Sequence, residues 1–95
     1  MAIQSFGHKG LEQLFCTGKS ALIGQRYRTR AGRILDILNA ATCVSDLAGA
    51  ADFHLLGGGR KGDFAMRVNQ NYRITFRFDK GDNGNVTDVN FEDYH

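Results

Sequence analysis

The sequence predicts a small α+β domain in which two helices precede an antiparallel sheet. Apolar residues recur at helical spacing before residue 42 and alternate with polar residues from residue 64 onward. The chain has 95 residues, of which 42% are hydrophobic and 23% are charged, as is typical of one globular domain with a modest core. We therefore expect a single domain, residues 1–95, in which an N-terminal helical hairpin packs on a small twisted sheet.

Two helices are expected in the first part of the chain. Leu11, Leu14 and Phe15 fall at i, i+3 and i+4 within residues 8–15, and Gly18 is suited to end this short helix. A longer helix is expected over residues 24–41. Its apolar stripe consists of Tyr27, Ala31, Ile34, Leu35, Leu38 and Ala41. His8, which stands beside Lys9, is expected to be a surface residue, and residues 42–52 are expected to form a connector.

The strongest strand pattern lies between Phe64 and Phe78. Apolar and polar residues alternate on both sides of Asn69-Gln70-Asn71, which predicts an antiparallel hairpin with one apolar and one polar face. The polar face carries Arg67, Arg73 and Arg77 and no acid, so it either holds phosphate or is simply solvated. Further strands are expected at residues 2–6, 53–56 and 86–91, the last with Val89 and Phe91 facing inward.

The net charge of +2 hides a strong segregation of charge. The balance is +5 over residues 1–33 and +4 over 60–80, but −3 over 34–59 and −4 over 81–95. Arg26, Arg30 and Arg33 share one face of the long helix, with Arg28 beside them. These basic segments indicate a local surface for an anionic partner, either RNA or an acidic protein, although a solvated helix face is equally compatible with the pattern.

Several classes of protein are disfavoured. The chain has no run of about 18 apolar residues and no apolar signal-peptide segment near its start. Cys16 and Cys43 form neither a disulfide framework nor a CxxC pair, so we expect reduced thiols, no metal and a cytoplasmic location. The loop over residues 57–62 (GGGRKG) lacks the GK[ST] ending of a nucleotide-binding loop, but Arg60 and Lys61 could contact a nucleic-acid backbone.

The chain carries the groups that metal-free RNA cleavage requires. One group must take the proton of the 2′-hydroxyl, another must protonate the leaving 5′ oxygen, and cations must stabilise the charge on phosphorus. A lone histidine in a short strand is more often structural, however, and a terminal Asp-Tyr-His is more often a frayed tail. The candidates are His54, Arg60, Lys61, Arg67, Arg73, Arg77, Asp93, Tyr94 and His95.

Three stretches carry a resemblance to a known family. They are IQSFGHKGLEQLFCTGK near the start, FHLLGGGRKGDFAMRVNQNYRITFRF in the middle and VNFEDYH at the end. Together they resemble the HigB group of bacterial toxins in the RelE/ParE superfamily, the toxic members of type II toxin–antitoxin pairs. The resemblance covers nearly the whole chain and is weakest over residues 42–52.

The resemblance implies both a fold and an activity. The fold is a RelE/ParE-like one, with two helices on a twisted antiparallel sheet, and the activity is ribosome-dependent endonuclease cleavage of mRNA in the ribosomal A site without a metal or other cofactor. A HigA-like helix-turn-helix antitoxin would neutralise the toxin, and operator DNA would be bound only through that complex. By resemblance, the site residues are His54, Asn71, Arg73, Asp93, Tyr94 and His95, while Arg26, Arg30 and Arg33 would contact the ribosome or the antitoxin.

One position departs from the family pattern. Related sequences usually carry His-Pro-Leu-Lys-Gly where this chain has His54-Leu55-Leu56-Gly57-Gly58, so a phosphate-binding lysine is missing. Either Arg60 or Lys61 compensates from the loop, or the toxin is weak. Two alternatives remain open from the sequence: a ParE-like inhibitor of DNA gyrase, against which the Asp-Tyr-His ending argues, and an inactive domain that only binds an antitoxin or operator DNA.

Overall fold

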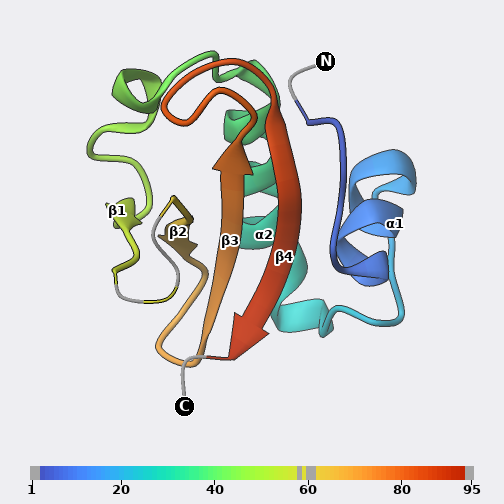
Figure 1. Cartoon of the computed structure of the whole chain (residues 1–95). Coiled ribbons are helices and arrows are strands. Elements are labelled where there is room, and N and C mark those ends of the chain that lie inside the picture. Colours follow the sequence, from blue (N-terminus) through green and yellow to red (C-terminus); the bar gives the residue numbers. More distant parts are fainter. Residues whose placement is uncertain (1–2, 58, 60–61, 94–95) are drawn as a thin grey trace.

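A computed structural model describes residues 3–57, 59 and 62–93 of the chain. It confirms the α+β architecture, because two helices precede a four-stranded antiparallel sheet (Figure 1). Helix α2 lies behind the sheet, and α1 lies beyond its β4 edge. The elements are α1 (Lys9–Thr17), α2 (Gln25–Ala40), the 3-10 helix η1 (Val44–Leu47), β1 (His54–Leu55), β2 (Phe64–Arg67), β3 (Tyr72–Phe78) and β4 (Val86–Asp93).

The strands follow one another in the sheet in the order of the sequence, β1-β2-β3-β4. The predicted hairpin is confirmed, with Phe64 opposite Phe76 and Arg67 opposite Arg73. Asn69 stabilises its turn, because its Oδ1 accepts hydrogen bonds from the backbone N–H groups of Asn71 and Tyr72 at 2.9 and 2.8 Å. The β3–β4 register shifts near the middle of the strands.

The predicted N-terminal strand is much reduced. Ile3 and Phe6 form isolated parallel bridges to Val86 and Val89, and the backbone N–H of Gln4 donates to the carbonyl of Val86 at 2.8 Å. Residue 2 lies outside the described residues. The segment therefore covers part of the free edge of β4 without forming a full strand.

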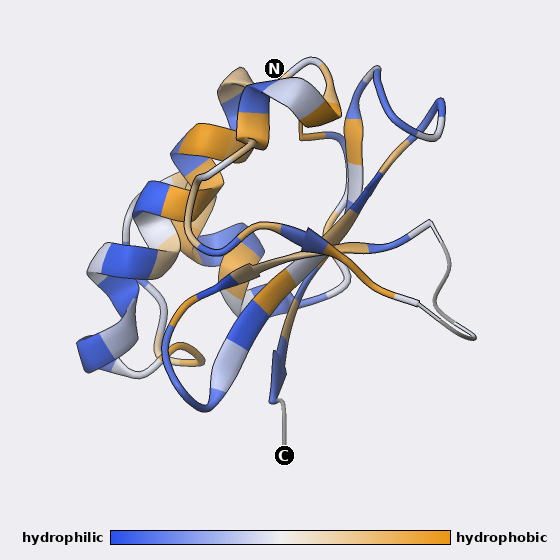
Figure 2. Ribbon diagram, turned by 90° about the vertical axis from the view of Figure 1, so that its left-hand side faces the viewer, coloured by the Kyte–Doolittle hydropathy of each residue, from blue (hydrophilic) through white to orange (hydrophobic). Residues whose placement is uncertain are grey.

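The core lies between α2 and the sheet. Figure 2 shows apolar residues of the helices turned toward the strands. Ala31, Ile34, Leu35 and Leu38 of α2 are buried in the same cluster as the apolar residues of β2, β3 and β4. This confirms the predicted helical stripe, although Tyr27 at its start is only partly buried.

Helix α1 begins with a cap that the sequence analysis did not predict. His8 Nδ1 accepts a hydrogen bond from the backbone N–H of Leu11 at 3.3 Å, and the imidazole packs on Phe91 with ring centroids 5.8 Å apart. The expectation that His8 is only a surface residue is therefore wrong. Gly18 ends the helix as predicted, in the left-handed conformation that glycine adopts readily.

Strand β4 is longer than predicted. It runs from Val86 to Asp93 rather than ending at residue 91, and Val89 and Phe91 face the helices as expected. Because acidic residues are unfavourable in strands, the sequence pattern ended the strand too early. The extra length brings Glu92 and Asp93 into the sheet.

Candidate active site and basic groove

The candidate site lies on the face of the sheet turned away from α2, which we call the outer face. His54 is paired with Ala65, Ala65 with Thr75 and Thr75 with Asn90, so these residues form one row across all four strands. Residues paired across antiparallel strands share a face, and residues two apart along a strand do too.

A second row on the outer face contains Arg67, Arg73 and Glu92. His54 and Arg73 are two strands and two residues apart, which places their Cα atoms roughly 12 Å apart at ordinary strand spacings. The long arginine side chain and the imidazole can therefore approach one phosphodiester group from opposite sides.

His54 is held by the backbone beside it. Its Nδ1 lies 2.8 Å from the carbonyl oxygen of Asp52. Because a carbonyl oxygen only accepts hydrogen bonds, this contact places the proton on Nδ1. In the neutral imidazole, Nε2 then carries the lone pair and is the nitrogen that can exchange a proton with a substrate.

The backbone that supplies this contact is strained. Ala51 and Asp52 have φ angles of 45° and 57°, in the left-handed region that residues other than glycine rarely adopt. The carbonyl of Ala51 accepts a 2.7 Å hydrogen bond from the N–H of Arg67, which ties the segment to β2. Strained pairs of this kind often accompany functional sites, and here the pair includes Asp52, whose carbonyl contacts His54.

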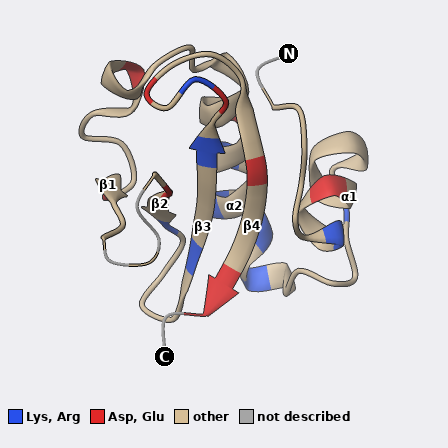
Figure 3. Ribbon diagram, viewed as in Figure 1, with Lys and Arg blue, Asp and Glu red and all other residues tan. Residues whose placement is uncertain are grey.

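The outer face is not the purely basic surface that the hairpin sequence predicted. Arg67 lies 4.0 Å from a carboxylate oxygen of Asp52, and Figure 3 shows basic residues of β3 beside acidic residues of β4. The acids come from outside the hairpin, from the preceding loops and from β4, which is why the hairpin sequence missed them. Within the described residues, Arg73 also pairs with Glu92 at 3.5 Å and Arg77 with Asp63 at 2.6 Å.

Thr75 and Glu92 are two outer-face residues that the sequence analysis did not nominate. The Thr75 hydroxyl donates to Glu92 Oε2 at 2.6 Å, while Glu92 Oε1 faces Arg73 Nη2. A shallow cavity of about 220 Å³ lies over this region. Recognising Glu92 required the register of β4, since only the pairing with β3 shows which of the two terminal acids faces Arg73.

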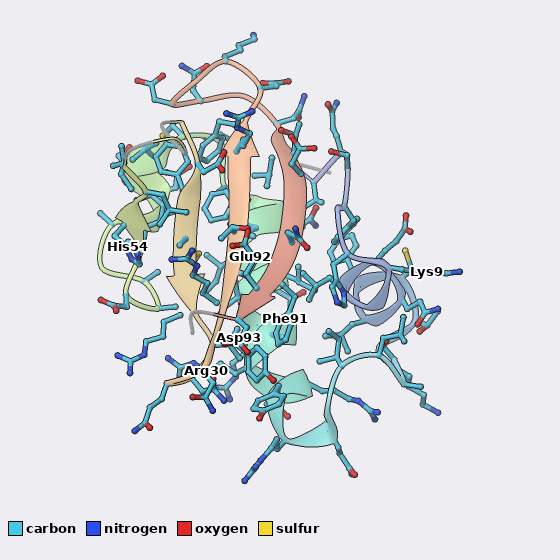
Figure 4. All side chains as sticks on the ribbon, turned by 60° about the horizontal axis from the view of Figure 1, so that its bottom comes forward. Lys9, Arg30, His54, Phe91, Glu92 and Asp93 are labelled. Atoms are coloured by element: carbon cyan, nitrogen blue, oxygen red, sulfur yellow. The ribbon has the colours of Figure 1, made fainter. Side chains whose placement is uncertain are left out.

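Asp93 lies on the opposite side of the sheet from Arg73. It is paired with Tyr72, which faces α2 and packs against Tyr27 with ring centroids 5.0 Å apart. Figure 4 shows Glu92 over the sheet and Asp93 at the end of β4. Asp93 is the last described residue of the chain. Its pairing with Tyr72 places it on the other side of the sheet from the row that contains Arg73.

A second polar surface, which we call the basic groove, runs between α2 and the β2–β3 turn. Three adjoining cavities of about 330, 360 and 430 Å³ share Arg30 as a lining residue. Arg30 Nε also donates to the carbonyl oxygen of Arg67 at 3.4 Å, which links the helix to β2. The polar residues that line these cavities are Arg26, Tyr27, Thr29, Arg30, Arg33, Asp52, Arg67, Asn69, Gln70 and Asn71.

The groove gathers residues that the sequence analysis had placed apart. Asn71, nominated beside Arg73, lines the same cavity as Arg26 and Arg30. Arg28, by contrast, is turned away, because its Nε donates to the carbonyl of Ile23 at 3.0 Å and its side chain lines a cavity between the two helices. Arg33 lines that cavity too, so the expectation that Arg28 lies beside the other helix arginines holds for Arg33 but not for Arg26 and Arg30.

Four of the nominated residues, Arg60, Lys61, Tyr94 and His95, lie outside the described residues. Among the residues that are described, no set of three or more His, Cys, Asp or Glu side chains is arranged to hold a metal ion. In the same part of the chain, no helix has the length and apolar character needed to cross a membrane. Cys16 and Cys43 are both free thiols.

Comparison with known proteins places this geometry in a family. Residues 4–95 match the model of a family described as the RelE-like toxin of the type II toxin–antitoxin system HigB. The chain is also 36% identical over 94 residues to a protein named Endoribonuclease HigB from Proteus vulgaris, and this covers 98% of the chain and 99% of the relative. The chain therefore belongs to the HigB-like family of RelE-type toxins.

Proposed function

We propose that this protein is an endoribonuclease toxin that cuts translated mRNA on the ribosome and is neutralised by a HigA-like antitoxin. The observation that carries the proposal is the outer face, where His54, held through Nδ1 by the carbonyl of Asp52, shares one face of the sheet with Arg73. The relative from Proteus vulgaris, which matches over nearly the full length of both chains, is itself named as an endoribonuclease.

The chemistry needs only side chains of this chain. The 2′-hydroxyl attacks phosphorus, the bond from phosphorus to the 5′ oxygen breaks, and the products are a 2′,3′-cyclic phosphate and a 5′-hydroxyl. One group removes the proton from the 2′-hydroxyl and a second gives a proton to the leaving oxygen. His54 exchanges one of these protons through Nε2, and Arg73 stabilises the charge that builds on the phosphoryl oxygens.

The remaining roles follow from the family resemblance. His95 shares proton transfer with His54, and Tyr94 positions or stacks on a base. Asp93, which is paired with Tyr72 on the helix side of the sheet, takes no direct part in proton transfer in this proposal. Asn71 helps to place the RNA, and Arg60 or Lys61 supplies the cation that Gly57 does not provide. Nothing in the described geometry favours gyrase inhibition, and the full-length match is to the HigB-like family.

The basic groove binds the ribosome through phosphates of ribosomal RNA. Its arginines and amide side chains are the groups that contact phosphate and base edges in RNA complexes. Because this binding supplies the affinity, the isolated protein should be nearly inert on free RNA in the cytoplasm and in the test tube.

The proposal is tested with purified protein on two substrates, a free mRNA and the same mRNA bound to ribosomes with an open A site. We expect cleavage of the ribosome-bound message only, and a loss of roughly 10²- to 10⁴-fold for His54→Ala, the range for removing a general acid or base. His8→Asn is the matched control, because it removes another histidine yet keeps a helix-capping side chain. Equal cleavage of free RNA would contradict ribosome dependence, and full activity of His54→Ala would contradict the assignment of the site.

A further inference from the structure

Thr75 is unusual among the polar outer-face residues because it is almost fully buried. Its exposed fraction is 2%, and Ser20 is the other buried polar residue in the described part of the chain. A buried hydroxyl without a hydrogen bond would destabilise the folded state. Thr75 avoids that cost by donating to Glu92 across the β3–β4 pair.

The two contacts of Glu92 differ in strength. The bond from Thr75 to Oε2 is 2.6 Å long, as expected for a short hydrogen bond to a carboxylate. The distance from Arg73 Nη2 to Oε1 is 3.5 Å, at the long end for a hydrogen bond. Thr75 therefore fixes the carboxylate, and the fixed carboxylate orients the guanidinium of Arg73 through a longer contact.

The backbone register makes this arrangement specific to Glu92. Arg73 and Glu92 are directly opposite each other, and the side chains of both are only about one-fifth exposed, at 19% and 20%. Asp93, the next residue, is paired with Tyr72 on the helix side of the sheet, so it cannot replace Glu92. One residue of the pair Glu92-Asp93 therefore faces Arg73 and the other does not.

We propose that Glu92, fixed by Thr75, is a positioning residue that aims the guanidinium of Arg73 at the scissile phosphate. This inference rests on the proposed function, because it gives Arg73 its role in cleavage. Arg73 has five N–H donors, so a guanidinium that keeps its contact with Glu92 retains donors for a phosphate. In this proposal, Glu92 contacts neither the RNA nor the reacting atoms and acts through Arg73.

The proposal predicts that the cleavage rate and the binding step respond differently when Glu92 is changed. Removing the carboxylate frees the guanidinium from its orientation, which lowers the rate of the chemical step. It also removes a negative charge from the surface that meets RNA, so binding to the ribosome–mRNA complex should be unchanged or tighter. A variant that had merely lost stability would show neither this separation nor normal binding.

The experiment measures single-turnover cleavage of ribosome-bound mRNA over a range of toxin concentrations. For Glu92→Gln we expect the plateau rate to fall roughly 10- to 100-fold, as when a group that orients a functional side chain is removed. The toxin concentration that gives half the plateau rate should not rise. Glu12→Gln is the matched control, because it removes the same charge from an exposed position on α1 and should leave both quantities unchanged.

Variants of Thr75 test the same chain of contacts without changing a charge. Thr75→Val removes the hydroxyl at nearly constant volume and should lower the plateau rate in the same direction as Glu92→Gln. Thr75→Ser keeps a hydroxyl and should restore the rate toward wild type. Thermal unfolding followed by circular dichroism shows whether each variant is folded at the assay temperature, and Thr75→Ser is the informative variant if Thr75→Val is not.

The outcomes separate this inference from the proposed function. An unchanged plateau rate for Glu92→Gln, together with a strong loss for Arg73→Ala, overturns the positioning role and leaves the proposed function standing. Full activity of Arg73→Ala overturns both. A rise in the half-saturating concentration of Glu92→Gln at an unchanged plateau would assign Glu92 to binding and also overturn the inference.

Discussion

The outer face and the basic groove both present arginines, but the two surfaces differ in whether carboxylates lie beside those arginines. On the outer face, Arg67, Arg73 and Arg77 each face a carboxylate at 2.6 to 4.0 Å. Arg67 and Asp52 also line the groove, but within the described residues the structure shows no ion pair for its helix arginines, Arg26, Arg30 and Arg33. Two surfaces with similar arginine content therefore have different net charges.

An RNA-cutting protein must bind a phosphate backbone and must also catalyse cleavage. These two functions require different arrangements of charge. Affinity for a phosphate backbone comes from uncompensated cations that release counterions on binding. Catalysis requires cations fixed in one geometry, and a neighbouring carboxylate restrains an arginine at the expense of net charge. The outer face has the arrangement suited to chemistry, and the groove has the arrangement suited to binding.

The largest expected effect separates the two surfaces through the rate of cleavage. Arg73→Ala should lower the plateau rate on ribosome-bound mRNA by about 10²-fold or more, as when a donor to a transition-state oxyanion is lost. Arg73→Lys should recover only part of the rate, because an ammonium group cannot form the forked contact of a guanidinium. A plateau rate for Arg73→Ala equal to that of wild type would remove the outer face from the chemistry.

The next effect concerns the salt dependence of ribosome binding. Replacing Arg26 and Arg30 together by Gln should reduce the slope of log affinity against log salt by about 1.4, if each contacts one phosphate of a single strand. The cleavage rate at saturating toxin should not change. Lys9→Gln, on α1 and labelled away from the groove in Figure 4, removes one positive charge and should leave the slope intact. An unchanged slope for the groove variant would show that binding uses another surface.

A smaller effect is expected at the edge of the outer face. Arg77 Nε lies 2.6 Å from Asp63, which is largely buried with 17% of its side chain exposed, while 49% of the Arg77 side chain is exposed. Breaking the pair by Asp63→Asn should lower the free energy of unfolding by about 1 kcal/mol or less, because the pair is partly solvated. Denaturant unfolding measures this change, and a loss of several kcal/mol would show that the pair is a main support of the fold.

Most of the fold was predictable because its signals are local. The hairpin followed from strict alternation around Asn69-Gln70-Asn71, and the long helix followed from its apolar stripe, observed at Gln25–Ala40 instead of 24–41. The candidate site was less predictable. The contact between Thr75 and Glu92 joins residues 17 positions apart in the chain and depends on a register that shifts within the β3–β4 pair. No periodicity in the sequence specifies that shift.

The capping role of His8 was likewise not predictable from the sequence. Replacing His8 is expected to have the smallest effect of the changes considered. Burial lowers the pKa of His8 from its ordinary value near 6.5. The neutral ring accepts the hydrogen bond that caps α1, so the contribution of this ring to stability is fully present above about pH 6.5. It is lost as the pH falls through the lowered pKa of the folded state.

Thermal unfolding at several pH values checks this. The unfolding temperature of wild type should decrease as the pH is lowered from neutral to mildly acidic. His8→Asn should remove that part of the pH dependence while keeping a capping oxygen. Cleavage at neutral pH should be the same for both proteins, because His8 belongs to neither surface. An identical pH dependence in wild type and His8→Asn would show that the cap does not titrate.

The central claim, that the outer face cuts translated mRNA, is tested most directly by mapping 5′ ends in cells that express the protein. One message is compared with the same message lacking its start codon, for wild type and for His54→Ala. We expect wild type to cut the intact message inside codons. No such cuts should appear when the start codon is absent or when His54 is replaced. Growth arrest with an intact message would contradict it and direct attention to DNA gyrase.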